Sequence, residues 1–299
     1  MIKDIAYKIA ENMGLKEWNY NTIISKFGRV GEPTHKFIIR INNSKGQWQF
    51  FVKVCKDSNL SKYLLNEAKN LEYLNELDIK GIPSLVLRDS YHGKEFLVES
   101  FIPGKKVRSY FDIIELARQW LADLYSATQK GFVSCDDLMD KASDYTRYLS
   151  KWFDLGDIIS LMEKHLPDKL LPLVFTHGDF WSDNVLVTRE GIGVIDFSLS
   201  EDNQPPLDIF TFINYLSLED PKIITSNERL RDLTECFLPD GVDPYFLLIY
   251  NAIRRAAQIT SWAEDLHNNL LLIDDRQVSK LAFYQIWLLK NLSLNLRIK

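Results

Sequence analysis

The chain has 299 residues, of which 46% are hydrophobic and 26% are charged, values typical of a soluble globular protein. A net charge of -5 argues against a broad nucleic-acid-binding surface, and no apolar run approaches the roughly 20 residues of a transmembrane helix. The three cysteines are odd in number and scattered, which predicts neither a disulfide framework nor a zinc site and favours a cytoplasmic protein.

The first part of the chain predicts one helix followed by an antiparallel sheet. Residues 2–13 have helical spacing without the apolar core of a signal peptide. The runs NTIISKF, HKFIIRIN and QWQFFVKVC have strand character, and short turns join them. The first turn contains Gly28 and Gly31, which suit an ordinary hairpin turn and a phosphate-contacting loop equally well.

A lysine in the third apolar run needs an explanation. Lys53 lies in the middle of FFVKVC, although an ammonium group is strongly hydrated. Taken alone, it fits a solvent-facing side chain slightly better than a phosphate ligand, and its order in the chain relative to the later motifs favours the phosphate ligand. Residues 59–77 then predict a helix, and SLVLRDS and EFLVESF predict a second hairpin.

The most informative stretch is LVFTHGDFWSDNVLVTREGIGVIDF, in which apolar runs flank a polar loop. The loop holds His177, Asp179 and Asn184, and Asp196 ends the last run. In phosphoryl transfer an Asp orients the attacking hydroxyl, while an Asn and a second Asp bind a divalent cation. Two alternatives remain. These residues could simply satisfy the backbone of a hairpin turn, where Asp and Asn are common. Alternatively, His177-x-Asp179 could be the first half of a non-haem iron site with two His ligands and one carboxylate. The iron site would need His267 and would leave Asn184 and Asp196 without a role.

The remainder of the chain predicts helices, at 112–128, within 137–166, from Asp208 onward, and at about 226–237, 243–264 and 276–295. Their many aromatic residues are expected to fill the core or, at some positions, to contact substrate. The basic residues Lys105, Lys106 and Arg108 are expected to form a solvated face.

The motif H-G-D-x-x-x-x-N followed by I-D-F resembles the aminoglycoside phosphotransferase and choline kinase superfamily, the small-molecule branch of the protein-kinase-like fold. Gly178 and Ser198 stand where protein kinases usually have Arg and Gly, which favours this branch. The resemblance implies an α+β, bilobal protein-kinase-like fold. A small N-lobe with an antiparallel sheet would cover residues 1–101, and a larger, mainly helical C-lobe would cover 102–299.

The resemblance also implies roles for individual residues. Asp179 would be the catalytic base, His177 would brace its loop, and Asn184 and Asp196 would bind Mg²⁺. Asp208 would accept hydrogen bonds from the catalytic loop backbone.

Nucleotide contacts follow from other matched segments. NEAKNLEYL is similar to the third helix of the family, which makes Glu67 the expected partner of Lys53. ESFIPG is similar to the segment between the lobes, so the carbonyl of Glu99 and the amide of Phe101 would contact the adenine. Gly28 and Gly31 would lie over the phosphates.

Together these features predict a phosphotransferase that moves the γ-phosphate of ATP, or of GTP, to a hydroxyl of a small molecule. The acceptor would be aminoglycoside-like, an amino alcohol or a sugar, and neither nucleic acid nor a membrane is an expected partner. The alternatives are a non-catalytic nucleotide-binding scaffold of the same fold and a protein kinase. The sequence leaves the acceptor and the oligomeric state open.

Overall fold

The computed structural model describes residues 2–15, 18–24, 36–43, 45, 48–55, 61–106, 113–219 and 226–268. These residues form two compact units. The first unit contains the described residues up to 106 together with Asp183–Ser200. The second contains those from 113 to 182 and from 201 to 268. The lobe boundary between residues 101 and 102 stays a prediction.

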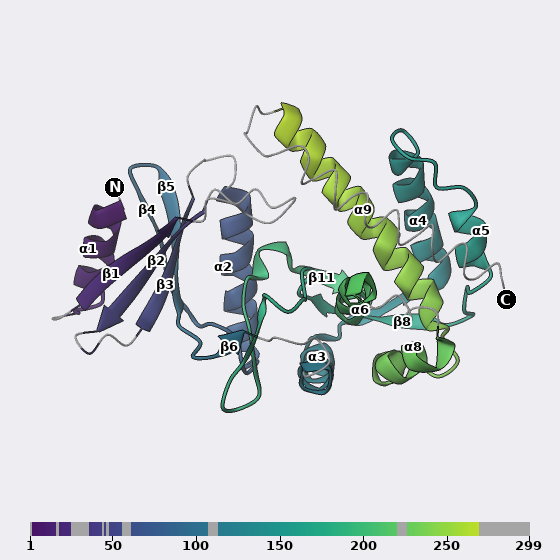
Figure 1. The fold of residues 1–299 in the computed structure, drawn as a ribbon, viewed down its shortest axis with the longest axis horizontal. Helices are drawn as coiled ribbons and strands as arrows, with labels where there is room; N and C mark the ends of the chain where they lie inside the picture. Colours follow the sequence, from purple (N-terminus) through teal and green to yellow (C-terminus); the bar gives the residue numbers. More distant parts are fainter. Residues whose placement is uncertain are drawn as a thin grey trace. The chain divides into compact units, whose positions relative to one another are not determined.

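A five-stranded antiparallel sheet is the basis of the first unit, with strand order β1-β2-β3-β5-β4 (Figure 1). Short connections between successive strands favour antiparallel pairing. The strands are β1 (Trp18–Ile24), β2 (Lys36–Asn43), β3 (Trp48–Cys55), β4 (Leu85–Tyr91) and β5 (Lys94–Ser100).

Two helices cover opposite faces of this sheet, as Figure 1 shows for α1 (Ile2–Asn12) and α2 (Ser61–Glu76). α1 buries Ile5, Ala6 and Ile9 against a patch of apolar strand residues: Ile41, Val52, Val54, Phe96 and Val98. Successive side chains of a strand point to opposite faces, so Lys53 points toward the face that α2 covers.

The segment Asp183–Ser200 belongs to the first unit through a second, smaller sheet with strand order β10-β9-β6. Its strands are β6 (Lys105–Lys106), β9 (Val185–Val187) and β10 (Ile192–Val194), and the 3-10 helix η3 (Phe197–Leu199) follows. At two positions in this sheet region, neighbouring atoms come so close to the backbone that there is no room for a Cβ. A Cβ at Gly104 would lie 2.7 Å from Leu186 Cβ, and one at Gly193 would lie 2.6 Å from Ile102 Cγ2. The expected solvated lysines, Lys105 and Lys106, are exposed on β6.

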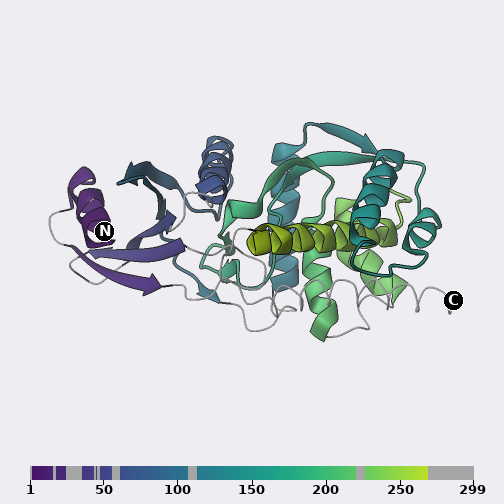
Figure 2. The ribbon, with the colours of Figure 1, turned by 90° about the horizontal axis from the view of Figure 1, so that it is seen from above.

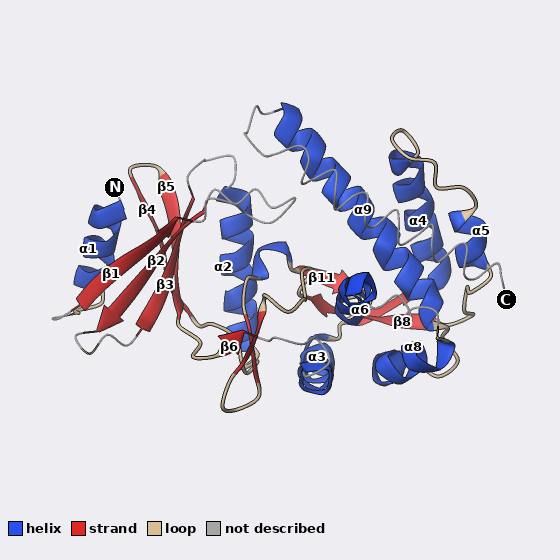
Figure 3. Ribbon diagram, in the orientation of Figure 1, coloured by secondary structure: helices blue, strands red, loops and turns tan. Residues whose placement is uncertain are grey.

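The second unit is mainly helical (Figure 3). Its helices are α3 (Ile114–Thr128), α4 (Cys135–Leu149), α5 (Ile158–Glu163), α6 (Asp208–Glu219), α8 (Asn227–Thr234), η4 (Glu235–Phe237) and α9 (Pro244–Asn268). A three-stranded antiparallel sheet of order β11-β8-β7 accompanies them, from β7 (Gly131–Ser134), β8 (Leu170–Thr176) and β11 (Glu201–Gln204).

Helix α9 organises the packing of the second unit. It contacts α4, α5, α6 and α8, and Figure 2 shows it in yellow-green running the length of the helical layer. Apolar and aromatic residues are buried along most of its first four turns, including Tyr245, Phe246, Tyr250 and Ile253. A long helix that is buried around much of its circumference can present polar side chains into the interior as well.

The predicted helix at 276–295 lies outside the described residues. Within the described ranges, no helix has the length and apolar character needed to cross a membrane.

Candidate functional site

In the first unit, the candidate site is built around one buried lysine held between two carboxylates. Lys53 Nζ on β3 lies 2.5 Å from Oε1 of Glu67 on α2 and 2.6 Å from Oε1 of Glu99 on β5. The Glu67 contact is a hydrogen bond, whereas the Glu99 contact has the distance of an ion pair without hydrogen-bond geometry. The structure thus forms the expected Lys53–Glu67 pair and adds the Glu99 side chain to it.

Strand register explains why Glu99 joins this pair. In the β3–β5 ladder Lys53 lies opposite Leu97, and Phe51 lies opposite Glu99. Lys53, Phe51, Leu97 and Glu99 therefore share one face of the sheet. The unbroken apolar run Phe96-Leu97-Val98 before Glu99 hides this alternation in the sequence.

The charges of the three groups are strongly coupled. Burial lowers the pKa of the Lys53 ammonium, but the negative charges of Glu67, Glu99 and Asp196 outweigh burial and hold that pKa above its ordinary value. Burial raises the pKa of Glu99 to about 7, although the charge of Lys53 opposes the rise. Lys53 is therefore a firmly protonated cation with two carboxylate neighbours.

The shift at Glu99 predicts a pH effect on stability. The pKa of Glu99 rises from 4.5 to about 7 on folding, so between these values the folded protein binds more protons than the unfolded chain. The contribution of Glu99 to the free energy of unfolding is fully present below pH 4.5. It is lost as the pH rises to 7, at roughly 1 kcal/mol per pH unit. We expect Glu99→Gln to remove this loss.

Urea unfolding of wild type and Glu99→Gln from pH 4 to 8 checks this expectation. The stability of the variant relative to wild type should rise between pH 4.5 and 7 and then level off. Parallel stability curves for the two proteins would show that Glu99 does not change its protonation on folding.

Helix α2 also fixes the segment that follows Asp196. Glu67 Oε1 accepts the N–H of Phe197 at 3.0 Å. Asn66 donates to the carbonyls of Ser198 and Ser200, and the Asn70 amide donates to those of Phe197 and Ser200. One helix face thus binds both the site lysine and the backbone next to Asp196.

Asn184 and Asp196 are the oxygen ligands expected for a divalent cation. The backbone N–H of Ile195 donates to the carbonyl of Asn184 at 2.9 Å, which brings the two positions together within the first unit. Asp196 has φ 68° and ψ 72°, a left-handed conformation that is strained for a residue with a Cβ, and Ser198 Oγ donates to its Oδ1 at 2.8 Å. A buried amide and a carboxylate suit a hard cation such as Mg²⁺.

In the second unit, the peptide of His177 and Gly178 is held by a buried acid. Asp208, at the start of α6, is fully buried and accepts the N–H of His177 on Oδ2 and that of Gly178 on Oδ1, each at 2.9 Å. Tyr125 donates its hydroxyl to Asp208 Oδ2 at 3.2 Å and accepts the N–H of Asp208 at the same distance. Burial raises the pKa of Asp208, while these donors limit the rise.

Gly178 has φ 78°, a conformation that favours glycine, so the H-G-D spacing reflects backbone geometry as well as chemistry.

The opposite side of this loop contacts an arginine that the sequence analysis did not identify. Arg255 on α9 donates from Nη1 to the carbonyl of Gly178 at 2.7 Å and from Nη2 to Asp179 Oδ1 at 2.9 Å. Its side chain is only 4% exposed. Asp179 itself is 7% exposed and thus largely enclosed by the protein.

His177 has a structural position consistent with bracing. Its Nδ1 accepts the N–H of Asp179 at 3.3 Å, and its ring meets the edge of Phe180, which stacks on Trp120. These contacts count against the iron alternative, because Asp179 pairs with a guanidinium and His177 Nδ1 bonds to the backbone. The side chain of His267 lies outside the described part of the chain.

Other predicted nucleotide contacts remain predictions. Gly28 and Gly31 lie outside the described residues. The ring of Phe101 packs on Phe51, with centroids 5.6 Å apart, so the segment after β5 is anchored to β3. The contacts of the Glu99 carbonyl and the Phe101 amide with an adenine are not tested by this packing.

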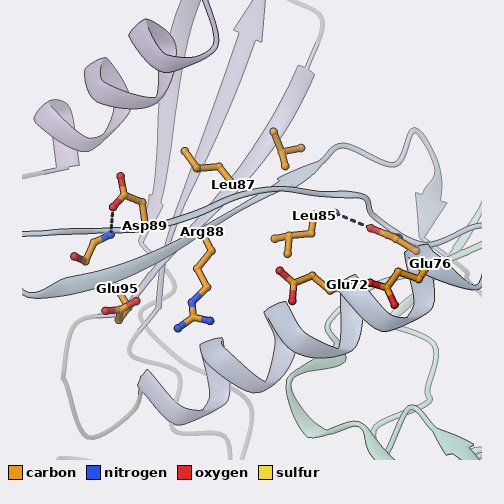
Figure 4. Close-up of a pocket in the computed structure, with 10 residues that line it drawn as sticks. Glu72, Glu76, Leu85, Leu87, Arg88, Asp89 and Glu95 are labelled. Carbon is orange, nitrogen blue, oxygen red and sulfur yellow. Dashed lines mark hydrogen bonds between the residues drawn. The ribbon is translucent and has the colours of Figure 1, made fainter.

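A separate surface groove of the first unit lies along α2 and β4 (Figure 4). Glu72, Glu76, Asp89 and Glu95 border it together with Arg88, and none of the predicted site residues that the structure describes lines it. Asn75 of α2 accepts the N–H of Leu85 on its side-chain oxygen, which fixes the start of β4. The groove therefore lies where α2 packs beside β4, and we assign it no part in the candidate site.

Comparisons with known proteins agree on one group. A model described as the Phosphotransferase enzyme family matches residues 36–244. The GDP complex of an aminoglycoside 2'-phosphotransferase-IIIa has a TM-score of 0.63 and 15% identity, covering 98% of this chain and 98% of that one. The amicoumacin kinase hAmiN, in complex with AMP-PNP, Ca²⁺ and Ami, has a TM-score of 0.55 and 14% identity, covering 97% and 96%.

A spectinomycin phosphotransferase in complex with ADP and spectinomycin has a TM-score of 0.52 and 15% identity, covering 95% of this chain and 93% of that one. The search of curated proteins gives no match. At these identities the solved structures establish the fold, and the predicted protein-kinase-like fold with two lobes is confirmed.

Proposed function

Because the chain belongs to the phosphotransferase enzyme family, we propose that it transfers the γ-phosphate of ATP, or of GTP, to a hydroxyl of a small molecule. The observation that supports this proposal most strongly is the buried Lys53–Glu67 pair, whose second partner Glu99 adds a further charge. Burying charged groups is energetically unfavourable, so their presence needs an explanation. A role of Lys53 in binding phosphate oxygens provides one.

The nucleotide half of the proposed reaction lies in the first unit. Lys53 would hold phosphate oxygens, and Glu67 would hold Lys53 in place. Asn184 and Asp196 would bind Mg²⁺, which when present neutralises charge on the phosphates. The left-handed backbone of Asp196, fixed through Phe197 and Ser198, would keep its carboxylate in position.

The acceptor half lies in the second unit. Asp179 would orient the acceptor hydroxyl and accept its proton as the oxygen bonds to the γ-phosphorus and the bond to the β-phosphate oxygen breaks. Asp208 and His177 would hold the loop through its backbone N–H groups. Catalysis of this kind depends mainly on positioning and charge, which hydrogen-bonded buried groups provide.

We propose that the phosphate acceptor is a small molecule, and we favour this over phosphorylation of a protein. Gly178 and Ser198 stand where protein kinases usually have Arg and Gly. Both residues have a structural role here, because Gly178 adopts a left-handed conformation and Ser198 donates a hydrogen bond to Asp196. The similar structures include enzymes named for aminoglycosides, amicoumacin and spectinomycin. We therefore propose a polar acceptor of the aminoglycoside, amino alcohol or sugar class.

A cytoplasmic location fits this proposal, since nucleotide triphosphates are available there. The three cysteines, Cys55, Cys135 and Cys236, form no disulfide bond, which fits a reducing compartment. The scaffold alternative would bind nucleotide without turnover.

The test is ATP consumption with Mg²⁺ across aminoglycosides, choline, ethanolamine, sugars, homoserine and fructosamines, repeated with GTP. We expect one acceptor class to stimulate turnover. Nucleotide binding without stimulation or hydrolysis would favour the scaffold, and absence of nucleotide binding would contradict the proposal.

A further inference from the structure

Two adjacent arginines of α9, Arg254 and Arg255, are both buried and both paired with carboxylates. Arg254 Nη2 lies 2.7 Å from Oε1 of Glu201 on β11, and its side chain is 7% exposed. Arg255 Nη2 lies 2.9 Å from Asp179 Oδ1, and its side chain is 4% exposed. The two guanidinium groups are similarly buried, although the Glu201 side chain is 39% exposed and that of Asp179 is 11% exposed. Of the two arginines, Arg255 is the one that contacts the loop that carries Asp179.

We propose that Arg255 is a positioning residue that holds the Asp179 carboxylate in its reactive orientation, an inference that rests on the proposed function. Its guanidinium contacts the loop twice, at the Gly178 carbonyl and at the Asp179 carboxylate. A planar guanidinium fixes two acceptors relative to each other, which a single point charge cannot do.

The loop is thus held from two directions. Asp208 accepts the N–H groups of His177 and Gly178, whereas Arg255 donates to the carbonyl of Gly178. The peptide between Gly178 and Asp179 therefore cannot rotate without breaking a hydrogen bond. Because Arg255 also bonds to the side chain of Asp179, it links the backbone of the loop to the carboxylate that would accept the proton.

Further contacts hold the guanidinium itself. Arg255 Nη1 donates to Gln258 Oε1 at 3.0 Å, one turn along α9. Burial lowers the pKa of Arg255, but the Tyr215 hydroxyl and the Asp179 carboxylate outweigh it and raise that pKa. The Tyr215 ring packs against Trp181, with centroids 5.1 Å apart. Arg255 is therefore a fixed cation that donates to the Asp179 carboxylate.

The test compares Arg255→Met, Arg255→Lys, Asp179→Asn, the Arg255→Met/Asp179→Asn double variant and Arg254→Met as the matched control. The assay is kcat with the best acceptor of the panel and the apparent KM for MgATP, with melting temperature as a check of folding. If no acceptor in the panel is used, hydrolysis of MgATP, with water as the acceptor, serves as the assay.

We expect Arg255→Met to lower kcat by about 100-fold, the effect of a misplaced reacting group, with the KM for MgATP within about twofold of wild type. Arg255→Lys should recover only part of kcat, since it keeps the charge and loses the two-point contact. Arg254→Met should lower the melting temperature and leave kcat within about twofold. The double variant should be no slower than Asp179→Asn, because residues that act as a unit are not additive.

The proposal is overturned if Arg255→Met keeps wild-type kcat while Asp179→Asn is inactive, and the proposed function then stands. Equal losses of kcat in Arg254→Met and Arg255→Met would also overturn it, by showing a general effect of packing. If Arg255→Met does not fold, Arg255→Lys decides, and wild-type kcat in that variant counts against the inference. Wild-type activity in Asp179→Asn would instead overturn the proposed base.

Discussion

Asp179→Asn is expected to lower turnover by about 10²–10⁴-fold, the usual contribution of a general base. The amide has nearly the same shape as the carboxylate but cannot accept the proton of the acceptor hydroxyl. Nucleotide binding should stay within about twofold of wild type, because Lys53, Asn184 and Asp196 are unchanged. Steady-state kinetics with the best acceptor and a nucleotide-binding titration measure the two effects separately.

Asp183→Asn is the matched control, since it makes the same chemical change four residues further along. Asp183 lies 3.8 Å from the exposed Lys106 and has no role in the proposed reaction. Its replacement should leave turnover close to wild type. Near wild-type turnover in Asp179→Asn would show that another group accepts the proton.

The second large effect is expected for Lys53→Met, which leaves the buried carboxylates of Glu67 and Glu99 without their cation. Removing one partner from a buried ion pair typically costs about 3–5 kcal/mol of unfolding free energy. Turnover should be lost as well, because the phosphate-binding cation is gone. Urea unfolding at pH 8, above the pKa of about 7 that Glu99 has when Lys53 is present, measures the stability loss.

Two further variants make this result specific. Lys106→Met removes an exposed lysine and should change stability by less than about 0.5 kcal/mol. Adding Glu99→Gln to Lys53→Met should restore part of the lost stability, since one buried charge disappears. A Lys53→Met protein as stable as wild type would mean that the three side chains are not coupled as their distances indicate.

The predictions that the structure bears on most directly depend on short-range sequence patterns. The order of Lys53, Glu67, Asp179, Asn184 and Asp196 along the chain follows one family pattern, and the structure pairs Lys53 with Glu67. The predicted helices at 59–77, 112–128 and 243–264 correspond to α2, α3 and α9 within a few residues at each end. Amphipathic spacing specifies such helices strongly.

The parts that were missed depend on contacts between distant segments. The Glu99 side chain reaches Lys53 only because of the β3–β5 register, which the short apolar run before Glu99 does not reveal. Arg255 lies 76 residues after Asp179, and nothing in its local pattern marks it. β11 has the polar sequence EDNQ, and β7 has only four residues, so neither shows the alternation that identifies a strand.

The proposed reaction moves a phosphoryl group from a nucleotide to a hydroxyl of a small molecule. The most direct measurement is incubation of the acceptor panel with γ-³²P-labelled ATP, Mg²⁺ and the protein, followed by separation of the products. We predict that label appears on one acceptor class with wild type and with Asp183→Asn, and that Asp179→Asn transfers little. Label found only in unreacted ATP, or only on protein, would contradict the claim.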